Sequence, residues 1–315
     1  MPAYEREIEI ALQAVSSAAV LCENVRGGED FQALAKSDRS PVTVADFGSQ
    51  AIVCRAIRNA FPNDFIIAEE DAGVLRDESQ ANLRQRVATE VRKVLPEADE
   101  AQTLAWIDAG GAREAASRVW TLDPIDGTKG YLRGGQYAVA LALIIDGQVE
   151  AAALGCPALD EQGSLFWAIR GQGAFQRTPE GDRAIRVSTT SDSSEAALCE
   201  SVESGHSDHD QSAKIAAALQ IVRPSVRMDS QAKYAAVARG DADIYLRLPT
   251  IAGYQEKIWD HAAGALLICE AGGQVSDIDG KPLDFSQGST LKNNRGVVAT
   301  NGQLHDLVIA AIAKT

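Results

Sequence analysis

The stretch LDPIDGTKGYLRGGQYAVAL, Leu122–Leu141, carries two aspartates to what reads as the end of a buried strand. It starts apolar, places two aspartates, a proline, a glycine and a threonine within residues 123–128, and becomes apolar again. Asp-Pro and Asp-Gly are common turn dipeptides, so a capped turn is one interpretation. Acids at the ends of other apolar segments favour a second interpretation, in which the carboxylates hold a cation.

Three other apolar segments also end or begin with acids. The predicted strand DFIIAEED ends in Glu69 and Glu70, TVAD ends in Asp46 at the head of a predicted helix, and Asp260 of IWDHAAGALL takes the N-cap position of another. Each acid alone could be a solvated loop residue or a cap. If they converge, two like charges about 4 Å apart cost roughly 4 kcal/mol at an effective dielectric of 20. Converging carboxylates therefore need a cation, and oxygen ligands select Mg²⁺ or a similar hard ion.

The spacing within DPIDGT fits such a site. Asp123 and Asp126 can flank one turn and face one ion or a pair of ions, and the carbonyl of Ile125 is available as a further ligand. Gly127 and Thr128 then begin a turn or helix whose amides could hold a phosphate. We therefore expect a metal at the strand end with an anion beside it.

Composition limits the kind of partner. The 315 residues include 44 acidic and 30 basic side chains, a net charge of −14, and no run of Lys and Arg. We expect no polymeric nucleic acid partner, although a bound cation would still allow a small polyanion to bind.

The five cysteines are scattered and form no Cys-x-x-Cys pair, which predicts free thiols in a reducing compartment.

The first residues, MPAYEREIEIALQAV, are charged and helical in pattern, unlike a signal peptide. The longest apolar run, Ala138–Ile145, is too short to span a bilayer. We expect a cytosolic protein without a membrane partner, or an organellar one if a transit peptide precedes this sequence.

Periodicity predicts two halves that differ in their pattern of secondary structure. The chain from residue 1 to 188 reads as an α+β half carrying most of the metal ligands, and 189–315 as an α/β half. Helices are expected at 3–25, 47–59, 77–95, 209–219, from 230, from 260 and at 303–313, with a mobile connector at 96–117 and a largely antiparallel meander between 118 and 188.

Several features of the second half have ordinary alternatives. Lys233 and Arg247 lie among apolar residues, as phosphate-binding cations do, but a surface lysine and a locally paired arginine explain them equally well. His206 and His209 could mark a transition-metal site or a polar loop. DIDGKPLDF, residues 277–285, lacks the alternating ligands and closing Glu of a calcium loop.

DPIDGT, the upstream EED and the downstream WDHAAG resemble the lithium-sensitive, magnesium-dependent phosphatases of the inositol monophosphatase superfamily. Within it, the chain is similar to the 3′(2′),5′-bisphosphate nucleotidase group over residues 36–264. The stretches that carry this similarity are KSDRSPVTVADFGSQ, GTKGYLRGGQYAVAL, SVESGHSDHDQ, DSQAKYAAVARGDADIYLRLP and YQEKIWDHAAG. Tyr131 stands where Phe is usual, and residues 71–117 match only loosely. The resemblance implies a layered α-β-α-β-α sandwich of the inositol monophosphatase/fructose-1,6-bisphosphatase type, with the active site between the halves.

The resemblance also implies residue roles. Asp46 and Thr128 would orient and deprotonate the attacking water, and Glu70 would lie behind the metal ligands or reach a further ion. The implied metal ligands are Glu69, Asp123, the Ile125 carbonyl, Asp126 and Asp260. The implied substrate contacts are Gly127, Thr128, His206, Ser230, Lys233, Arg247 and Asp260.

The implied activity is Mg²⁺-dependent hydrolysis of the 3′-phosphate of adenosine 3′,5′-bisphosphate (PAP), giving AMP and phosphate. Two or three Mg²⁺ ions would assist attack by water without a covalent intermediate, and Li⁺ would inhibit. The sulfated relative phosphoadenosine phosphosulfate (PAPS) would be a second substrate, which links the protein to sulfur assimilation, and the family implies a monomer.

Other activities remain open at the level of sequence. The same metal site could serve an inositol polyphosphate 1-phosphatase acting on inositol 1,4-bisphosphate, an inositol monophosphatase or a fructose bisphosphatase. GTKGYLRGG argues against the monophosphatase, in which Thr-Asn-Phe typically follows the Gly-Thr pair. A covalent aspartyl mechanism needs Asp-x-Asp, whereas this chain has Asp-x-x-Asp. A non-catalytic PAP or metal sensor would be expected to lack the pair Asp46 and Thr128.

Overall fold

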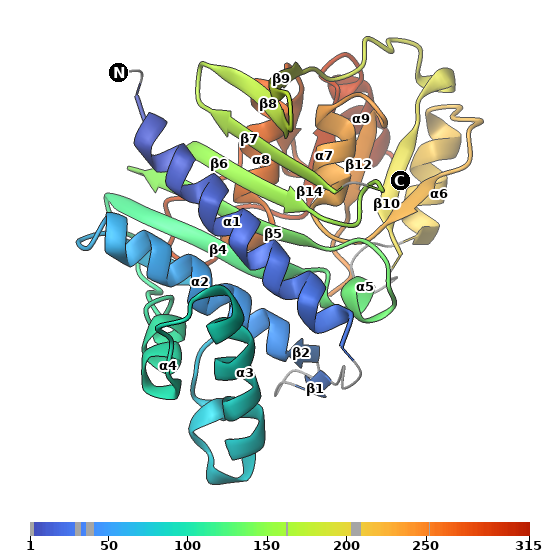
Figure 1. Ribbon diagram of the computed structural model, residues 1–315. Helices are drawn as coiled ribbons and strands as arrows, with labels where there is room; N and C mark the ends of the chain where they lie inside the picture. Colours follow the sequence, from blue (N-terminus) through green and yellow to red (C-terminus); the bar gives the residue numbers. More distant parts are fainter. Residues whose placement is uncertain (1–2, 29–32, 36–40, 162, 203–208, 252) are drawn as a thin grey trace.

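The computed structural model describes residues 3–28, 33–35, 41–161, 163–202, 209–251 and 253–315. These residues form five layers in the order helix, sheet, helix, sheet, helix (Figure 1). The layered arrangement predicted from the sequence is therefore confirmed.

The first helical layer lies on one face of the larger sheet. It contains α1 (Glu5–Arg26), α2 (Val44–Ala60), α3 (Ala81–Val94) and α4 (Glu100–Asp108). By length and composition, α1 alone among the described helices could cross a membrane, but half of its most apolar window is buried within the molecule. Leu12, Val15 and Leu21 of α1 are buried in the core, as in the interior helices of globular proteins.

The larger sheet has seven strands in sequential order. They are β3 (Phe65–Ala68), β4 (Arg118–Asp126), β5 (Ala138–Ile145), β6 (Gln148–Cys156), β7 (Ser164–Ile169), β8 (Gly173–Thr178) and β9 (Gly181–Ile185). Only β3 and β4 pair in parallel, so the predicted antiparallel meander is confirmed. Helices cover both faces of its centre, which explains why β4 and β5 are buried almost throughout and why β5 is continuously apolar instead of alternating.

The second sheet has five strands in the order β11-β10-β12-β14-β13. They are β10 (Leu198–Ser201), β11 (Val226–Met228), β12 (Ile244–Arg247), β13 (Gln274–Ser276) and β14 (Val297–Thr300). Strands β10, β11 and β12 run parallel, and β14 pairs antiparallel with both β12 and the edge strand β13. The sequence patterns did not predict β13 and β14, since segments of three and four residues are too short to show a period.

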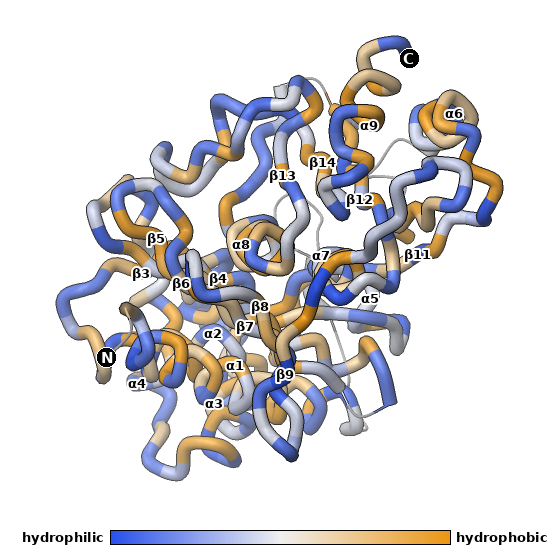
Figure 2. The backbone as a smooth tube through the Cα atoms, turned by 90° about the horizontal axis from the view of Figure 1, so that it is seen from above, coloured by the Kyte–Doolittle hydropathy of each residue, from blue (hydrophilic) through white to orange (hydrophobic). Residues whose placement is uncertain are grey.

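Two central helices, α7 (Ala232–Ala238) and α8 (Ala262–Glu270), fill the space between the sheets. Figure 2 shows α8 nearly end-on between strands of the two sheets. The outer layer holds α6 (His209–Ala218) and α9 (His305–Ile312). Residue 188 falls between β9 and β10, and a division into two domains there stays a prediction because one apolar cluster joins both sheets through α7 and α8.

The prediction of a mobile connector at 96–117 was wrong. This segment contains α4, which begins with a capping box: Asp99 accepts a hydrogen bond from the Gln102 amide, and the Gln102 side chain accepts one from the Asp99 amide. The Asp-x-x-Gln spacing was a usable signal for this helix start. The helix predicted at 77–95 begins later, at Ala81, after two short 3₁₀ turns.

Gly264 sets how closely α8 approaches α7, because a β carbon at this position would overlap the ring of Tyr234. We expect Gly264→Ala to lower the free energy of unfolding by about 1–3 kcal/mol through overpacking. Gly27→Ala is the control, since its nearest neighbour would lie 3.5 Å away and its φ is negative. Denaturant unfolding of both variants tests this, and equal stabilities would contradict close packing of the two helices.

Candidate active site

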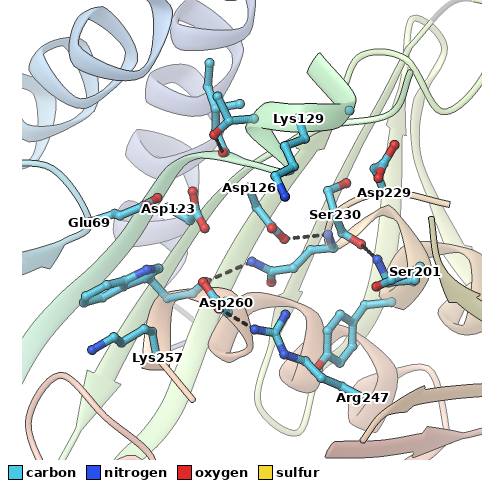
Figure 3. A pocket seen from close by; sticks show the side chains of 18 of the residues that line it. Glu69, Asp123, Asp126, Lys129, Ser201, Asp229, Ser230, Arg247, Lys257 and Asp260 are labelled. Carbon is cyan, nitrogen blue, oxygen red and sulfur yellow. Dashed lines mark hydrogen bonds and ion pairs between the residues drawn. The ribbon is translucent and has the colours of Figure 1, made fainter. Parts of the chain in front are cut away.

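A cavity of about 460 Å³ opens where the larger sheet meets the second sheet. Its walls come from the end of β4, the short helix α5 (Thr128–Leu132), the segment after β11, the end of β12 and the 3₁₀ turn η4 (Ile258–Asp260). Figure 3 shows the carboxylates of Glu69, Asp123, Asp126 and Asp260 directed toward a shared space. Four of the acids that the sequence singled out, from three separate segments, therefore line one cavity.

The end of β4 is shaped to present its two aspartates. Asp123 still pairs with the neighbouring strand and is only 2% exposed, and the register then shifts before Asp126. The Ser49 hydroxyl donates a 2.8 Å hydrogen bond to the Pro124 carbonyl within this irregular part. Because β4 continues to Asp126, both acids belong to the last part of the strand, as the sequence predicted.

Gly127 is the turning point between strand and helix. Its φ of +85° lies in the left-handed region, and a β carbon there would approach the Ser230 β carbon to 2.9 Å. Only glycine satisfies both conditions. The chain can therefore reverse at once and place Thr128 at the first position of α5.

Asp46 and Thr128 are brought together although they are far apart in sequence. One carboxylate oxygen of Asp46, Oδ2, accepts hydrogen bonds from the Thr43 amide at 2.7 Å and the Thr43 hydroxyl at 2.6 Å. The other, Oδ1, accepts one from the Thr128 hydroxyl at 3.2 Å, and this hydroxyl also lies 3.3 Å from the Ile125 carbonyl. Asp46 is fully buried and does not line the cavity itself, whereas its partner Thr128 does.

Two sequence placements of acids at helix starts need correction. Asp46 is not the residue before a helix that begins at Phe47, because α2 starts at Val44 with Thr43 as its cap, and Asp46 closes the capping box from inside the first turn. Asp260 is not the cap of α8 either. It ends the 3₁₀ turn, and His261 precedes the helix. Both carboxylates are thereby directed to the site instead of serving simply as caps.

The adjacent acids Glu69 and Glu70 have different surroundings. Glu69 is half-buried and lines the cavity. Glu70 is 5% exposed and does not line it. The Gln50 side chain accepts a hydrogen bond from the Glu70 amide at 3.0 Å and donates one to the Glu70 carbonyl at 2.6 Å. These two hydrogen bonds fix the end of β3 so that Glu69 faces the cavity.

The chain was compared with known proteins over its whole length. The sequence model of a family described as "Inositol monophosphatase family" matches residues 3–315. A 3′(2′),5′-bisphosphate nucleotidase of Emericella nidulans is 45% identical, covering 99% of this chain and 98% of the relative. A nucleotidase of Schizosaccharomyces pombe is 43% identical, covering 98% of this chain and 96% of the relative.

The chain belongs to the inositol monophosphatase family. Two solved structures agree in fold: the extragenic suppressor protein suhB of Bartonella henselae (TM-score 0.71, 22% identity, covering 98% of this chain and 99% of that one) and an inositol monophosphatase of Anabaena (TM-score 0.66, 24% identity, covering 99% and 96%). The predicted family, fold and enzyme class, a phosphatase, are thereby confirmed.

In this member of the inositol monophosphatase family, the ligand set suits a hard divalent cation. Carboxylates and a backbone carbonyl offer only oxygen donors, which fits Mg²⁺. Burial raises the pKa of Asp126, opposed by Lys233 and Arg247. Burial also raises the pKa of Asp260 to about 6, and Arg247 only partly opposes this. A bound cation would stabilise the charged form of these desolvated carboxylates.

The cations expected in the second half also line the cavity. Lys233 is 3% exposed, so the surface-lysine alternative is wrong. Its ammonium donates to the carbonyls of Ser230 at 2.8 Å and Met228 at 3.2 Å, and it lies 5.2 Å from the ring centre of Tyr245. Burial lowers the Lys233 pKa, and the charge of Asp126 opposes this.

Arg247 is paired with local acids, as the ordinary alternative predicted. Its guanidinium contacts Glu256 at 2.7 Å and Asp260 at 3.2 Å. Glu256 also contacts His261 at 3.2 Å, and His261 contacts the Tyr234 hydroxyl at 2.7 Å. Although burial would raise it, Arg247 and His261 lower the pKa of Glu256 to about 2. Arg247 nevertheless lines the cavity.

Sequence reasoning missed several lining residues. These are Arg113, Lys129, Ser201, Asp229, Gln231, Tyr254, Lys257 and Trp259. The Gln231 amide donates a 2.6 Å hydrogen bond to Asp126. Lys129 and Lys257 adjoin the DGT and WDHAAG motifs, and Asp229 begins the stretch DSQAKY beside Ser230, which was the available signal for these three residues. Glu256, Asp260 and His261 have ligand atoms within 4.8 Å of one another, but Arg247 already engages two of these groups.

Some expected features lie elsewhere. His206 and the side chain of His209 lie outside the part of the chain that the structure describes. The choice between a transition-metal site and a polar loop at these histidines therefore stays open. In the weak calcium-loop match, one carboxylate oxygen of Asp277 accepts hydrogen bonds from the Asp279 and Lys281 amides, and the other from Asn294. Asp277 therefore braces its own loop.

We expect Mg²⁺ to raise the thermal unfolding temperature, because a ligand that binds only the folded state stabilises it by about 2.7 kcal/mol at one hundred times its Kd. Asp123→Asn should abolish most of this response and, without metal, should be at least as stable as the unchanged protein because like-charge repulsion falls. Asp182→Asn, on the distant β8–β9 hairpin, is the control. A full Mg²⁺ response in Asp123→Asn would contradict the assignment.

Proposed function

We propose that the protein hydrolyses the 3′-phosphate of adenosine 3′,5′-bisphosphate to AMP and phosphate in a Mg²⁺-dependent reaction. The observation that carries this proposal is a single cavity that is lined both by converging carboxylates and by the buried cations Lys233 and Arg247. A substrate with two phosphates can place one beside the carboxylates, where a cation would bind, and the other beside Lys233 and Arg247. The names of the relatives at 43–45% identity agree with this substrate.

Asp46 and Thr128 are proposed to activate the attacking water. The Thr128 hydroxyl can pass its proton toward Asp46 Oδ1 while its oxygen accepts a hydrogen bond from water. Thr43 keeps the Asp46 carboxylate in this orientation through two hydrogen bonds to Oδ2. Since the carboxylate is buried and fixed before substrate arrives, little rearrangement accompanies the proton transfer.

The proposed metal ligands are Glu69, Asp123, the Ile125 carbonyl, Asp126 and Asp260. Two or three Mg²⁺ ions, when bound, would supply charge neutralisation at the reacting phosphate and a more acidic water, without a covalent enzyme intermediate. Glu70, behind Glu69, is proposed to support this shell or to reach a further ion. Inhibition by Li⁺ is proposed from the family resemblance.

The other end of the cavity is proposed to bind the second phosphate and the nucleoside. Lys233 and Arg247 supply positive charge, and the hydroxyl of Ser230 and the backbone at Gly127 adjoin them. Asp260 would connect the two ends, since it faces the metal-binding acids and contacts Arg247. His206 is proposed as a further nucleoside contact.

PAPS is proposed as a second substrate, because its added sulfate lies on the 5′ side, away from the reacting 3′-phosphate. The net charge of −14 supports a small-molecule substrate over polymeric nucleic acid. A monomeric state, a cytosolic location and the absence of a membrane partner stay predictions.

Phosphate release from adenosine 3′,5′-bisphosphate, inositol 1,4-bisphosphate, inositol 1-phosphate and fructose 1,6-bisphosphate tests the proposal. Each substrate is assayed with Mg²⁺, with and without millimolar Li⁺. We expect the nucleotide to be preferred and Asp46→Asn to lower its turnover on the order of 10²–10⁴-fold, with folding intact, because the proton acceptor is lost.

The alternatives give different patterns in the same assay. Preference for an inositol or sugar phosphate would keep the metal site and exclude the proposed roles of Ser230, Lys233 and Arg247. No release from any substrate, together with retained binding of adenosine 3′,5′-bisphosphate, would indicate a sensor instead of an enzyme.

A further inference from the structure

Two segments that are distant in sequence lie against each other along the cavity wall. The first is the turn 126–133, which follows β4, and the second is the segment 229–231, which follows β11. Figure 3 shows Asp126 and Ser230 from these two segments facing each other across the wall. We call the set of contacts between them the latch.

The inner contacts of the latch join the two segments in antiparallel order, 126 with 231 and 127 with 230. Asp126 accepts the 2.6 Å hydrogen bond from the Gln231 amide. One residue further along the turn, Gly127 lies so close to Ser230 that no side chain fits between them. Ser230 itself has a φ of +65°, a backbone conformation that costs free energy in a residue other than glycine. Surrounding contacts must hold it there.

The outer contact of the latch is an ion pair. Arg133 donates hydrogen bonds to both carboxylate oxygens of Asp229, at 3.0 and 2.9 Å. Gly130 leaves room for this carboxylate, since a β carbon there would lie 2.6 Å from Asp229 Oδ2. The Arg133 side chain is 43% exposed, but that of Asp229 is only 8% exposed and lines the cavity. Both hydrogen bonds come from Nη2 of Arg133, and because Asp229 is buried, this ion pair is screened less than a surface ion pair.

The latch joins the two ends of the proposed active site. The turn 126–133 carries Asp126 and Thr128 of the reacting end, whereas Ser230 and Lys233 of the binding end lie in or directly after the other segment. The relative position of these segments therefore sets the distance between the reacting phosphate and a second phosphate.

We propose that Arg133 and Asp229 are a positioning pair that sets this distance, and that they thereby determine the preference for a nucleotide with two phosphates. This inference rests on the proposed function. Neither side chain touches the reacting atoms in this role. They act through Thr128 on one segment and through Ser230 on the other.

The test removes the pair without leaving an unpaired charge, by combining Arg133→Met with Asp229→Asn. The matched control combines Arg177→Met with Asp182→Asn. Arg177 and Asp182 also form a pair with two hydrogen bonds, here from Nε and Nη2 of the arginine at 2.8 and 2.9 Å, on the β8–β9 hairpin and away from the cavity. Both double variants and the unchanged protein are assayed with adenosine 3′,5′-bisphosphate and with adenosine 3′-monophosphate, which lacks the second phosphate.

We expect kcat/KM for the bisphosphate to fall about 10- to 100-fold in the Arg133/Asp229 double variant, since small misplacements of bound groups cost up to about 10²-fold. For the monophosphate, which uses only the reacting end, we expect a fall of less than about threefold, because discrimination is lost only where both ends bind. The control pair should change neither value. Equal falls for both substrates, or no fall for either, would overturn the proposal.

Amide hydrogen exchange without substrate or metal provides a second, independent readout. We expect residues 126–133 and 229–231 to exchange faster together in the Arg133/Asp229 double variant and to be unchanged in the control. If only one segment changes, the latch does not couple them. If the unchanged protein shows no preference for the bisphosphate, the proposed function fails, while joint exchange of the two segments still decides whether they are coupled.

Discussion

Repulsion among desolvated carboxylates is the constraint on which this structure depends. Glu69, Asp123, Asp126 and Asp260 come from three separate segments and line one cavity. Holding them there requires rigid supports, and the fold supplies them: β4 is buried on both faces, and the Gln50 side chain fixes the end of β3. The five layers can be understood as the scaffold that keeps these like charges together until a cation binds.

Positively charged side chains in the same cavity offset part of the repulsion among the carboxylates. Lys233 and Arg247 are both largely buried, and each acts electrostatically on Asp126. Arg247 is in turn held by Glu256 and its contact with His261. The cavity therefore carries both acidic and basic side chains before any ligand is present, which suits a substrate that carries two phosphates on a rigid sugar.

The sequence predicted those parts of the site that have a local signal. DPIDGT, the acids after β3 and the residues WDHAAG each combine an apolar segment with an acid at its end, and the structure brings them together at one cavity. Strands β13 and β14 were missed because they are short, whereas helix α4 carries a capping-box spacing, Asp99 to Gln102, that could have predicted it. The pair Arg133 and Asp229 could not be found from sequence, since 96 positions separate the two residues and no spacing rule connects them. His206 stays a prediction.

The central claim is that the converging acids form the metal site, and locating the ions tests it most directly. Crystals of the protein grown with Mn²⁺ in place of Mg²⁺ would show the ions in anomalous difference maps. The account predicts peaks within bonding distance of Glu69, Asp123, the Ile125 carbonyl, Asp126 and Asp260. Peaks confined to Glu256 and His261, or none in this cavity at saturating Mn²⁺, would contradict it.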